Sequence, residues 1–129
     1  MHRWVDHTSE LELRVSAATT EAVFAEATEA LGEQLGEPVG GVTAHPVSVS
    51  ARDPAGLLAG WLEELVLLSE RDSLIAVGTR RVSLAAGRAE GEVECRAGRP
   101  SYLVKAVTYH RLSLERSDGG WEATVVLDV

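Results

Sequence analysis

The positions of hydrophobic and polar residues predict a mixture of strands and helices. Apolar and polar residues alternate along four short segments, residues 11–15, 42–51, 74–84 and 89–97. This alternation is typical of half-buried β-strands. Two longer segments instead have apolar residues at helical spacing. The first begins at Thr19-Thr20 and ends before Gly36, and the second begins at Asp53-Pro54. Both segments start with a favourable N-cap residue, a threonine in the first and Asp53 in the second.

The C-terminal end predicts a long β-hairpin. Strand-forming residues are frequent in 104–115 and 121–129, and residues 117–120 (Ser-Asp-Gly-Gly) supply a turn between them. Strand alternation places Lys105 and His110 on opposite faces of the first of these strands. A pairing that is symmetric about Asp118-Gly119 sets Asp128 opposite residue 109, so we expect Lys105 a few positions further along.

The order of the elements predicts an α+β fold in a single domain that spans residues 1–129. We expect two layers: one mixed, largely antiparallel sheet of about six strands, with two helices packed on one face. Residues 4–7 are short and polar, and residues 38–41 and 98–101 carry glycine and proline. We therefore expect no strand in any of these three segments.

Composition limits the classes of partner and location. The net charge of −8, without any cluster of Lys and Arg, opposes direct binding to a nucleic-acid backbone. There is no apolar signal segment at the N-terminus and no apolar run of membrane length, so we expect a soluble, cytoplasmic protein without membrane contact. The single cysteine, Cys95, fits a reducing compartment and is expected to be a small buried residue.

The chemistry-bearing residues are few. The chain has no Gly-rich phosphate loop, C-x-x-C, H-E-x-x-H or G-x-S-x-G motif. Lys105 is the only lysine beside eleven arginines. Codon bias with one chance exception explains this count, and so does a site that requires a compact ammonium group whose pKa can change.

Carboxylates gather near both ends of the chain. Asp6 and Glu10 flank His7 before the first predicted strand, and Asp128 precedes the terminal Val129. A chain end that lies in a sheet can offer the Asp128 carboxylate and the terminal oxygens as hard ligands for a divalent cation. Solvated acids at strand ends are the alternative interpretation.

Together these segments resemble the archease family over nearly the whole chain. Residues 6–10 (Asp-His-Thr-Ser-Glu) are similar to the family's N-terminal Asp/Glu-His-Thr-Ala-Asp signature, and residues 105–110 (Lys-Ala-Val-Thr-Tyr-His) match a family motif closely. Residues 20–31 and 61–65 are similar to its two helices, and residues 126–129 (Val-Leu-Asp-Val) resemble its C-terminal end.

The resemblance implies an accessory protein and not an enzyme. Archeases assist RtcB-type RNA ligases in tRNA splicing and RNA repair, where they promote guanylylation of the ligase and multiple turnover. The resemblance also implies a divalent metal, with calcium expected and magnesium or manganese as alternatives, held by Glu10, Asp128 and Val129. It implies a functional role for Lys105, whose ammonium group we expect within reach of Asp128 or Glu10.

Three further positions, Asp6, His7 and His110, are expected to support this site. Glu10 stands where the family usually has Asp, and its side chain is one methylene longer. Calcium tolerates such a change better than magnesium does, because its coordination is more flexible.

Two other functions remain open from the residues alone. One is a small metal-dependent hydrolase that uses the same acids with His110 or His7 as the base. It requires a substrate pocket and a positioned base. The other is a chaperone-like interaction domain without chemistry, which requires an exposed apolar patch and no role for Lys105.

Overall fold

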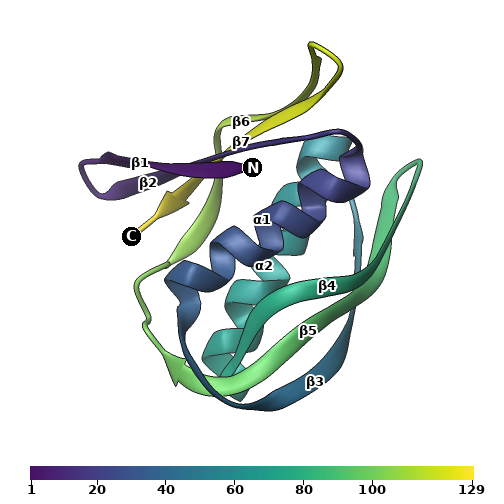
Figure 1. Ribbon diagram of the computed structural model, residues 1–129. Coiled ribbons are helices and arrows are strands. Elements are labelled where there is room, and N and C mark those ends of the chain that lie inside the picture. The colour runs from purple at the N-terminus through teal and green to yellow at the C-terminus, as the bar shows by residue number, and fades with distance from the viewer.

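Seven strands and two helices make up the computed structural model, which describes residues 1–129 (Figure 1). The elements are β1 (His2–His7), β2 (Glu10–Ala17), α1 (Thr20–Leu35), β3 (Gly36–Ser50), α2 (Pro54–Asp72), β4 (Leu74–Ala85), β5 (Arg88–Pro100), β6 (Ala106–Ser117) and β7 (Gly120–Asp128). Sheet A has the order β1-β2-β7-β6, and sheet B has the order β3-β5-β4. All strand pairs are antiparallel.

The α+β class, with two helices and antiparallel strands, is confirmed. The strands divide into two sheets, however, instead of the one sheet of about six strands that we expected. The helices lie between these sheets and not on one face of a single sheet (Figure 1). The reason is the width of the apolar surface on α2, which buries nine residues between Leu57 and Ser69. A stripe this broad can contact both sheets at once.

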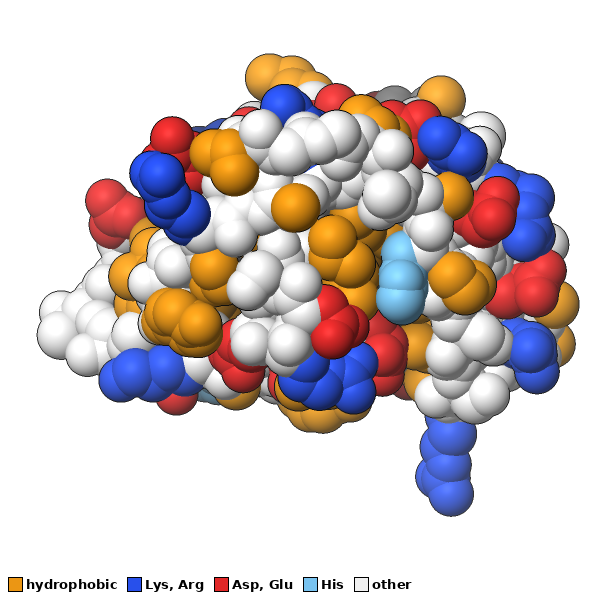
Figure 2. Space-filling model, turned by 90° about the horizontal axis from the view of Figure 1, so that it is seen from below, with side chains coloured by type: hydrophobic (Ala, Val, Ile, Leu, Met, Phe, Trp, Pro, Cys, Tyr) orange, Lys and Arg blue, Asp and Glu red, His pale blue; other side chains and the backbone are white.

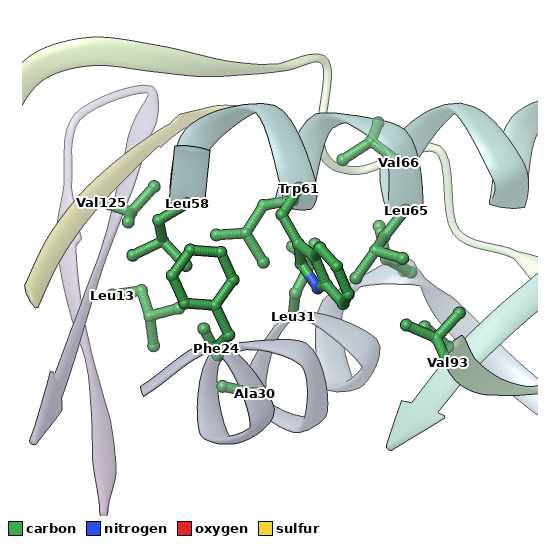
Figure 3. Close-up of a cluster of buried hydrophobic side chains, with 14 of the residues drawn as sticks. Leu13, Phe24, Ala30, Leu31, Leu58, Trp61, Leu65, Val66, Val93 and Val125 are labelled. Carbon is green, nitrogen blue, oxygen red and sulfur yellow. The ribbon is translucent and has the colours of Figure 1, made fainter. Parts of the chain in front are cut away.

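Side chains from both helices meet at the centre of the core (Figure 3). Phe24 of α1 and Trp61 of α2 are fully buried in an edge-to-face arrangement, with ring centroids 5.7 Å apart. The indole Nε1 of Trp61 donates to Thr28 Oγ1 at 3.0 Å, and this hydroxyl donates to the Phe24 carbonyl oxygen at 2.8 Å. The buried indole nitrogen and the Thr28 hydroxyl therefore both have hydrogen-bond partners. Leu13 and Val125 of sheet A and Val93 of sheet B complete this cluster.

Helix α1 also packs closely on sheet B at a glycine. A Cβ atom added at Gly32 would lie 2.1 Å from the carbonyl oxygen of Ala76 in β4. The helix can approach the strand backbone this closely only because position 32 has no side chain.

The N-terminal residues form a strand, contrary to expectation. β1 pairs with β2, and its side chains also reach α1. The His2 ring is hydrogen-bonded to Glu26, and Trp4 Nε1 donates to Glu33 Oε1 at 3.1 Å. The hydrogen bond that His2 donates to the Glu26 carboxylate raises the pKa of His2 and lowers the pKa of Glu26. Hydrogen bonds from β1 side chains to α1 thus hold β1 in place, although this strand has little alternation of apolar and polar residues.

The two predicted loops at residues 38–41 and 98–101 are also largely strand. β3 begins at Gly36, and its register with β5 shifts between Pro38 and Val42. β5 continues to Pro100. Glycine and proline are compatible with these segments because the pairing is irregular there.

Cys95 is fully buried in β5, as expected, and burial raises its pKa to about 11. Its thiol is therefore protonated at neutral pH and is a packing group. Neither helix combines the length and apolar character that are required to cross a lipid bilayer.

Charges of both signs share the surface of sheet B. Figure 2 shows the molecule from below, with acidic and basic side chains interspersed among apolar ones. Two ion pairs connect β4 to β5, Arg80 to Glu94 at 3.3 Å and Arg81 to Glu90 at 3.0 Å. These arginines are therefore partly neutralised.

Candidate functional site

The C-terminal residues lie beside the start of β2 in sheet A. β7 lies between β2 and β6, and Asp128 is directly opposite Glu10 on one side and Ala106 on the other. Residues that are directly opposite in an antiparallel pair share one face of the sheet. Leu127, which precedes Asp128 in β7, is fully buried in the core. The Glu10 and Asp128 side chains therefore lie on the outer face, away from the helices.

An irregularity in β6 sets this alignment. Thr108 is opposite Val126, whereas Ser113 is opposite Thr124, so four residues of β6 (109–112) span a single residue of β7. The symmetric pairing that we expected placed residue 109 opposite Asp128, but the bulge moves Ala106 into that position. The register therefore differs by three residues (109 − 106) from the prediction, and the Lys105 segment lies closer to the chain end.

The bulge also directs an arginine across β7 to carboxylates of β2. Arg111 has a left-handed backbone, with φ of 54°. Its Nη2 lies 3.2 Å from Glu10 Oε2 and 3.3 Å from Glu12 Oε1. Its Nη1 lies 2.8 Å from His110 Nε2. Bulges commonly re-aim a side chain in this way. No sequence signal singled out Arg111, because its position depends on the bulge.

Glu12 is the buried member of this charged cluster, and sequence reasoning missed it as well. Only 3% of the residue is exposed, yet it lies on the outer face of β2. Its carboxylate accepts from Arg14 Nε at 2.5 Å and lies 3.3 Å from His7 Nε2 and from Arg111. The hydrogen bond from Arg14 lowers the pKa of Glu12. The cluster thus keeps this buried carboxylate charged and paired.

Backbone hydrogen bonds anchor the C-terminal residues. The N–H of Val129 donates to the carbonyl oxygen of Ser9 at 3.2 Å, in the turn between β1 and β2. The N–H of Lys105 donates to the carbonyl oxygen of Asp128 at 2.8 Å. The terminal carboxylate is therefore held beside the strand that carries Glu10.

The Lys105 backbone lies next to Asp128, as the hypothesis requires. No ion pair joins its ammonium group to Asp128 or Glu10, and the residue is exposed. Two features account for the absence of this ion pair. The residue opposite Asp128 is Ala106, and Arg111 already neutralises Glu10. The Lys105 backbone is thus placed beside Asp128, and the reach of its ammonium group to the acids stays a prediction.

The three supporting positions have different surroundings. His7 lies directly opposite Glu10 across the β1–β2 pair and shares its face. Asp6 precedes it, so strand alternation directs the Asp6 side chain to the other face. His110 lies in the β6 bulge, where it contacts Arg111. Only His7 is therefore brought beside the acids directly.

The donors at the chain end fit a hard divalent cation in their chemistry. The carboxylates of Glu10 and Asp128 are neighbours on one face, and the oxygens of Val129 are anchored nearby. Calcium prefers such oxygen ligands. No group of three or more His, Cys, Asp or Glu side chains is placed to hold a metal ion. A site here would therefore need the terminal oxygens, and Arg111 already holds one oxygen of Glu10.

Comparisons with known proteins identify the family of the chain. The sequence model of the archease protein family matches residues 2–129. The "Protein archease" of Methanopyrus kandleri is 32% identical over 135 residues, which cover 97% of this chain and 96% of that protein. The protein of the same name from Methanosarcina mazei is 30% identical over 139 residues, which cover 99% of this chain and 95% of that protein.

Two solved structures share the fold. The solution structure of a Methanobacterium thermoautotrophicum protein has a TM-score of 0.71 at 22% identity and covers 99% of this chain and 98% of its own. A Thermotoga maritima crystal structure, described as an archease and possible chaperone, has a TM-score of 0.71 at 18% identity and covers 100% of this chain and 98% of its own. The family model and the two sequence relatives together show that the chain belongs to the archease family.

Proposed function

We propose that this protein is an accessory factor for an RtcB-type RNA ligase in tRNA splicing and RNA repair. It promotes guanylylation of the ligase and allows multiple turnover, and it is not itself an enzyme. One observation supports this best: the register of sheet A puts the Lys105 segment beside Asp128, with Glu10 directly across. Segments that are far apart in the sequence, each similar to a family motif, thus form one end of the sheet.

The exposed side chains around Lys105 suit contact with a protein partner. Tyr102, Leu103 and Tyr109 have 66%, 43% and 72% of their surface exposed. Aromatic side chains are frequent at protein interfaces. The Lys105 ammonium group has no ion-pair partner within the chain, so it is free to bind a phosphate or a carboxylate of the ligase.

The acids at the chain end would hold the metal. Glu10 and Asp128 supply carboxylate oxygens, and Val129 supplies terminal oxygens, to calcium or alternatively to magnesium or manganese. When bound, the cation supplies positive charge that can stabilise the phosphates of the ligase's nucleotide. The chain's own part is to orient these oxygens on a rigid sheet, while the net charge of −8 disfavours direct contact with RNA. We place this activity in the cytoplasm.

A chaperone-like interaction domain without chemistry is the second candidate. The exposed apolar side chains beside Lys105 favour it, and the Thermotoga maritima protein is described as a possible chaperone. The two candidates differ in what they require of Asp128. A ligase activator needs the carboxylate, whereas a domain that binds only through apolar contacts does not.

The deciding experiment mixes a purified RtcB-type ligase with GTP and a divalent metal, with and without this protein. The covalent guanylylated ligase and the number of RNA joining events per ligase are measured. We expect wild type to raise both quantities and Asp128→Ala to lose the effect. Asp118→Ala is the matched control, because Asp118 is an exposed aspartate in the distant β6–β7 turn.

Other outcomes have distinct meanings. Ligase guanylylation that is equal with and without the protein would contradict the proposal. Stimulation that survives Asp128→Ala would favour the chaperone-like candidate. Turnover of RNA or GTP by the pure protein, abolished by Asp128→Ala, would instead indicate the metal-dependent hydrolase.

A further inference from the structure

The position of Arg111 bears directly on how the chain end binds a cation. Its guanidinium group lies 3.2 Å from Glu10 Oε2, so a positive charge already occupies one oxygen of the expected ligand. Glu10 and Asp128 are directly opposite each other. A divalent ion between them would face the guanidinium at short range, and like charges repel.

Arg111 can leave Glu10 without leaving the cluster. Its side chain is 43% exposed, which gives the guanidinium group access to solvent. Its second carboxylate partner, Glu12, also has Arg14 and His7 as neighbours. The buried charge of Glu12 therefore remains paired when Arg111 moves.

We propose that Arg111 is a built-in cation that a divalent metal ion must displace from Glu10, so that the β6 bulge sets the metal affinity of the chain end. This inference rests on the metal site of the proposed function and concerns its regulation. It gives the bulge a role: three extra residues in β6 bring a positive charge across β7 to a carboxylate of β2. A partner that attracts Arg111 elsewhere, through a carboxylate or a phosphate of its own, would then promote metal binding.

The test is calorimetric titration of the whole protein with CaCl₂ and MnCl₂ at low ionic strength. We expect Arg111→Ala to bind Ca²⁺ at least about fivefold more tightly than wild type. Loss of an exposed ion pair accounts for up to about that factor. The repulsion between the guanidinium group and the bound cation is lost as well. Arg111→Lys keeps the charge and should stay within about twofold of wild type.

Arg80→Ala is the matched control. Arg80 is 48% exposed and lies 3.3 Å from Glu94 on sheet B, so its pairing and exposure resemble those of Arg111. Its removal changes the net charge by the same amount away from the chain end. Ca²⁺ affinity should remain within about twofold of wild type, because distant surface charges are screened.

The outcomes separate this inference from the metal site itself. Equal affinities of wild type and Arg111→Ala would overturn the inference and leave the metal site standing. Absence of binding in every variant would overturn both, while ligase stimulation would still test the accessory role. An Arg80→Ala protein that gains as much affinity as Arg111→Ala would show a general charge effect and overturn the inference.

A second measurement uses the wild-type chain, in case Arg111→Ala folds poorly. The side-chain Nε resonance of Arg111 is followed by NMR during a Ca²⁺ titration, with Arg80 as the internal reference. We expect the Arg111 resonance to shift as the guanidinium group leaves Glu10. An unchanged resonance at saturating Ca²⁺ would overturn the inference.

Discussion

Replacing Glu12 with glutamine should destabilise the protein at neutral pH. Glu12 is the buried carboxylate that holds Arg14 at 2.5 Å and Arg111 at 3.3 Å on the outer face of sheet A. Glutamine has nearly the same shape but carries no charge, and one of its two former carboxylate oxygens becomes an amide donor. That amide group faces arginine donors, so the replacement loses the charge-assisted hydrogen bonds without creating a cavity.

The expected loss follows from the exposure of the partners. A hydrogen bond to a charged group contributes about 1.5–3 kcal/mol. The arginines are 47% and 43% exposed, so water can hydrate them after the change. This keeps the cost below the roughly 3–5 kcal/mol found when a fully buried pair is broken. For 129 residues, the unfolding entropy is about 0.27 kcal/mol/K, so the Tm should fall by about 6–11 °C.

The effect should depend on pH in a defined direction. The Arg14 hydrogen bond lowers the pKa of Glu12 below its ordinary value of 4.5. The unfolded chain therefore takes up this proton first as the pH falls. The stabilisation by Glu12 is fully present above pH 4.5 and is lost as the pH falls through the lower pKa of the folded state. Glutamine does not titrate, so the difference from wild type should shrink as the pH falls below 4.5.

Urea denaturation at several pH values, together with thermal unfolding at pH 7, measures this difference. Glu90→Gln is the control, because Glu90 accepts from Arg81 at 3.0 Å but both side chains are about half exposed. Its loss should cost less than about 1 kcal/mol. A Glu12→Gln protein that is as stable as wild type at pH 7 would refute the reasoning. So would a stability difference that does not shrink as the pH falls below 4.5.

Four further predictions follow from single positions. Lys105→Ala should change the free energy of unfolding by no more than about 0.5 kcal/mol yet abolish stimulation of ligase guanylylation. Lys105→Arg should also stimulate the ligase poorly, because a planar guanidinium cannot replace a compact ammonium. Full stimulation by Lys105→Ala would contradict the role. Extending the chain beyond Val129 converts the terminal carboxylate into an amide and should weaken Ca²⁺ binding by calorimetry, whereas unchanged heats would remove Val129 from the ligand set. His2→Ala should lower stability most below pH 6.5, and the difference in urea denaturation should shrink as the pH rises through the raised pKa of His2; a difference that is constant with pH would argue against the ion pair. Gly32→Ala should cost about 1–3 kcal/mol because its Cβ would lie 2.1 Å from a backbone oxygen of β4, whereas Gly41→Ala, with nothing within 4 Å, should be nearly neutral in thermal unfolding.

The sequence by itself determined both helices and the strand type of most other segments. Thr19 caps α1 by accepting from the N–H of Ala22 at 3.0 Å, and Asp53 caps α2 by accepting from the N–H of Gly56 at 2.7 Å. These bonds join residues only three positions apart, so the local sequence contains all the information that they require. The turn at residues 117–120 is local in the same way and joins β6 to β7 as predicted.

The acids of the site were also identifiable from the sequence. Glu10 and Asp128 were singled out by their place at strand ends and by resemblance to family motifs, and they are direct neighbours in sheet A. Strand alternation predicts which residues share a face. It does not predict which residues of two distant strands are opposite each other, since that depends on the whole sheet.

Only the tertiary structure decided the division into two sheets, the pairing of β1, and the surroundings of Glu10. Helices with a broad apolar surface gain more burial between two sheets than against one, and no single strand carries that information. The three-residue bulge in β6 moves Ala106 opposite Asp128 and brings Arg111 to Glu10 and Glu12. Arg111 and Glu10 are 101 positions apart in the chain. Their contact depends on the order of three strands, β6, β7 and β2, which local sequence patterns do not encode.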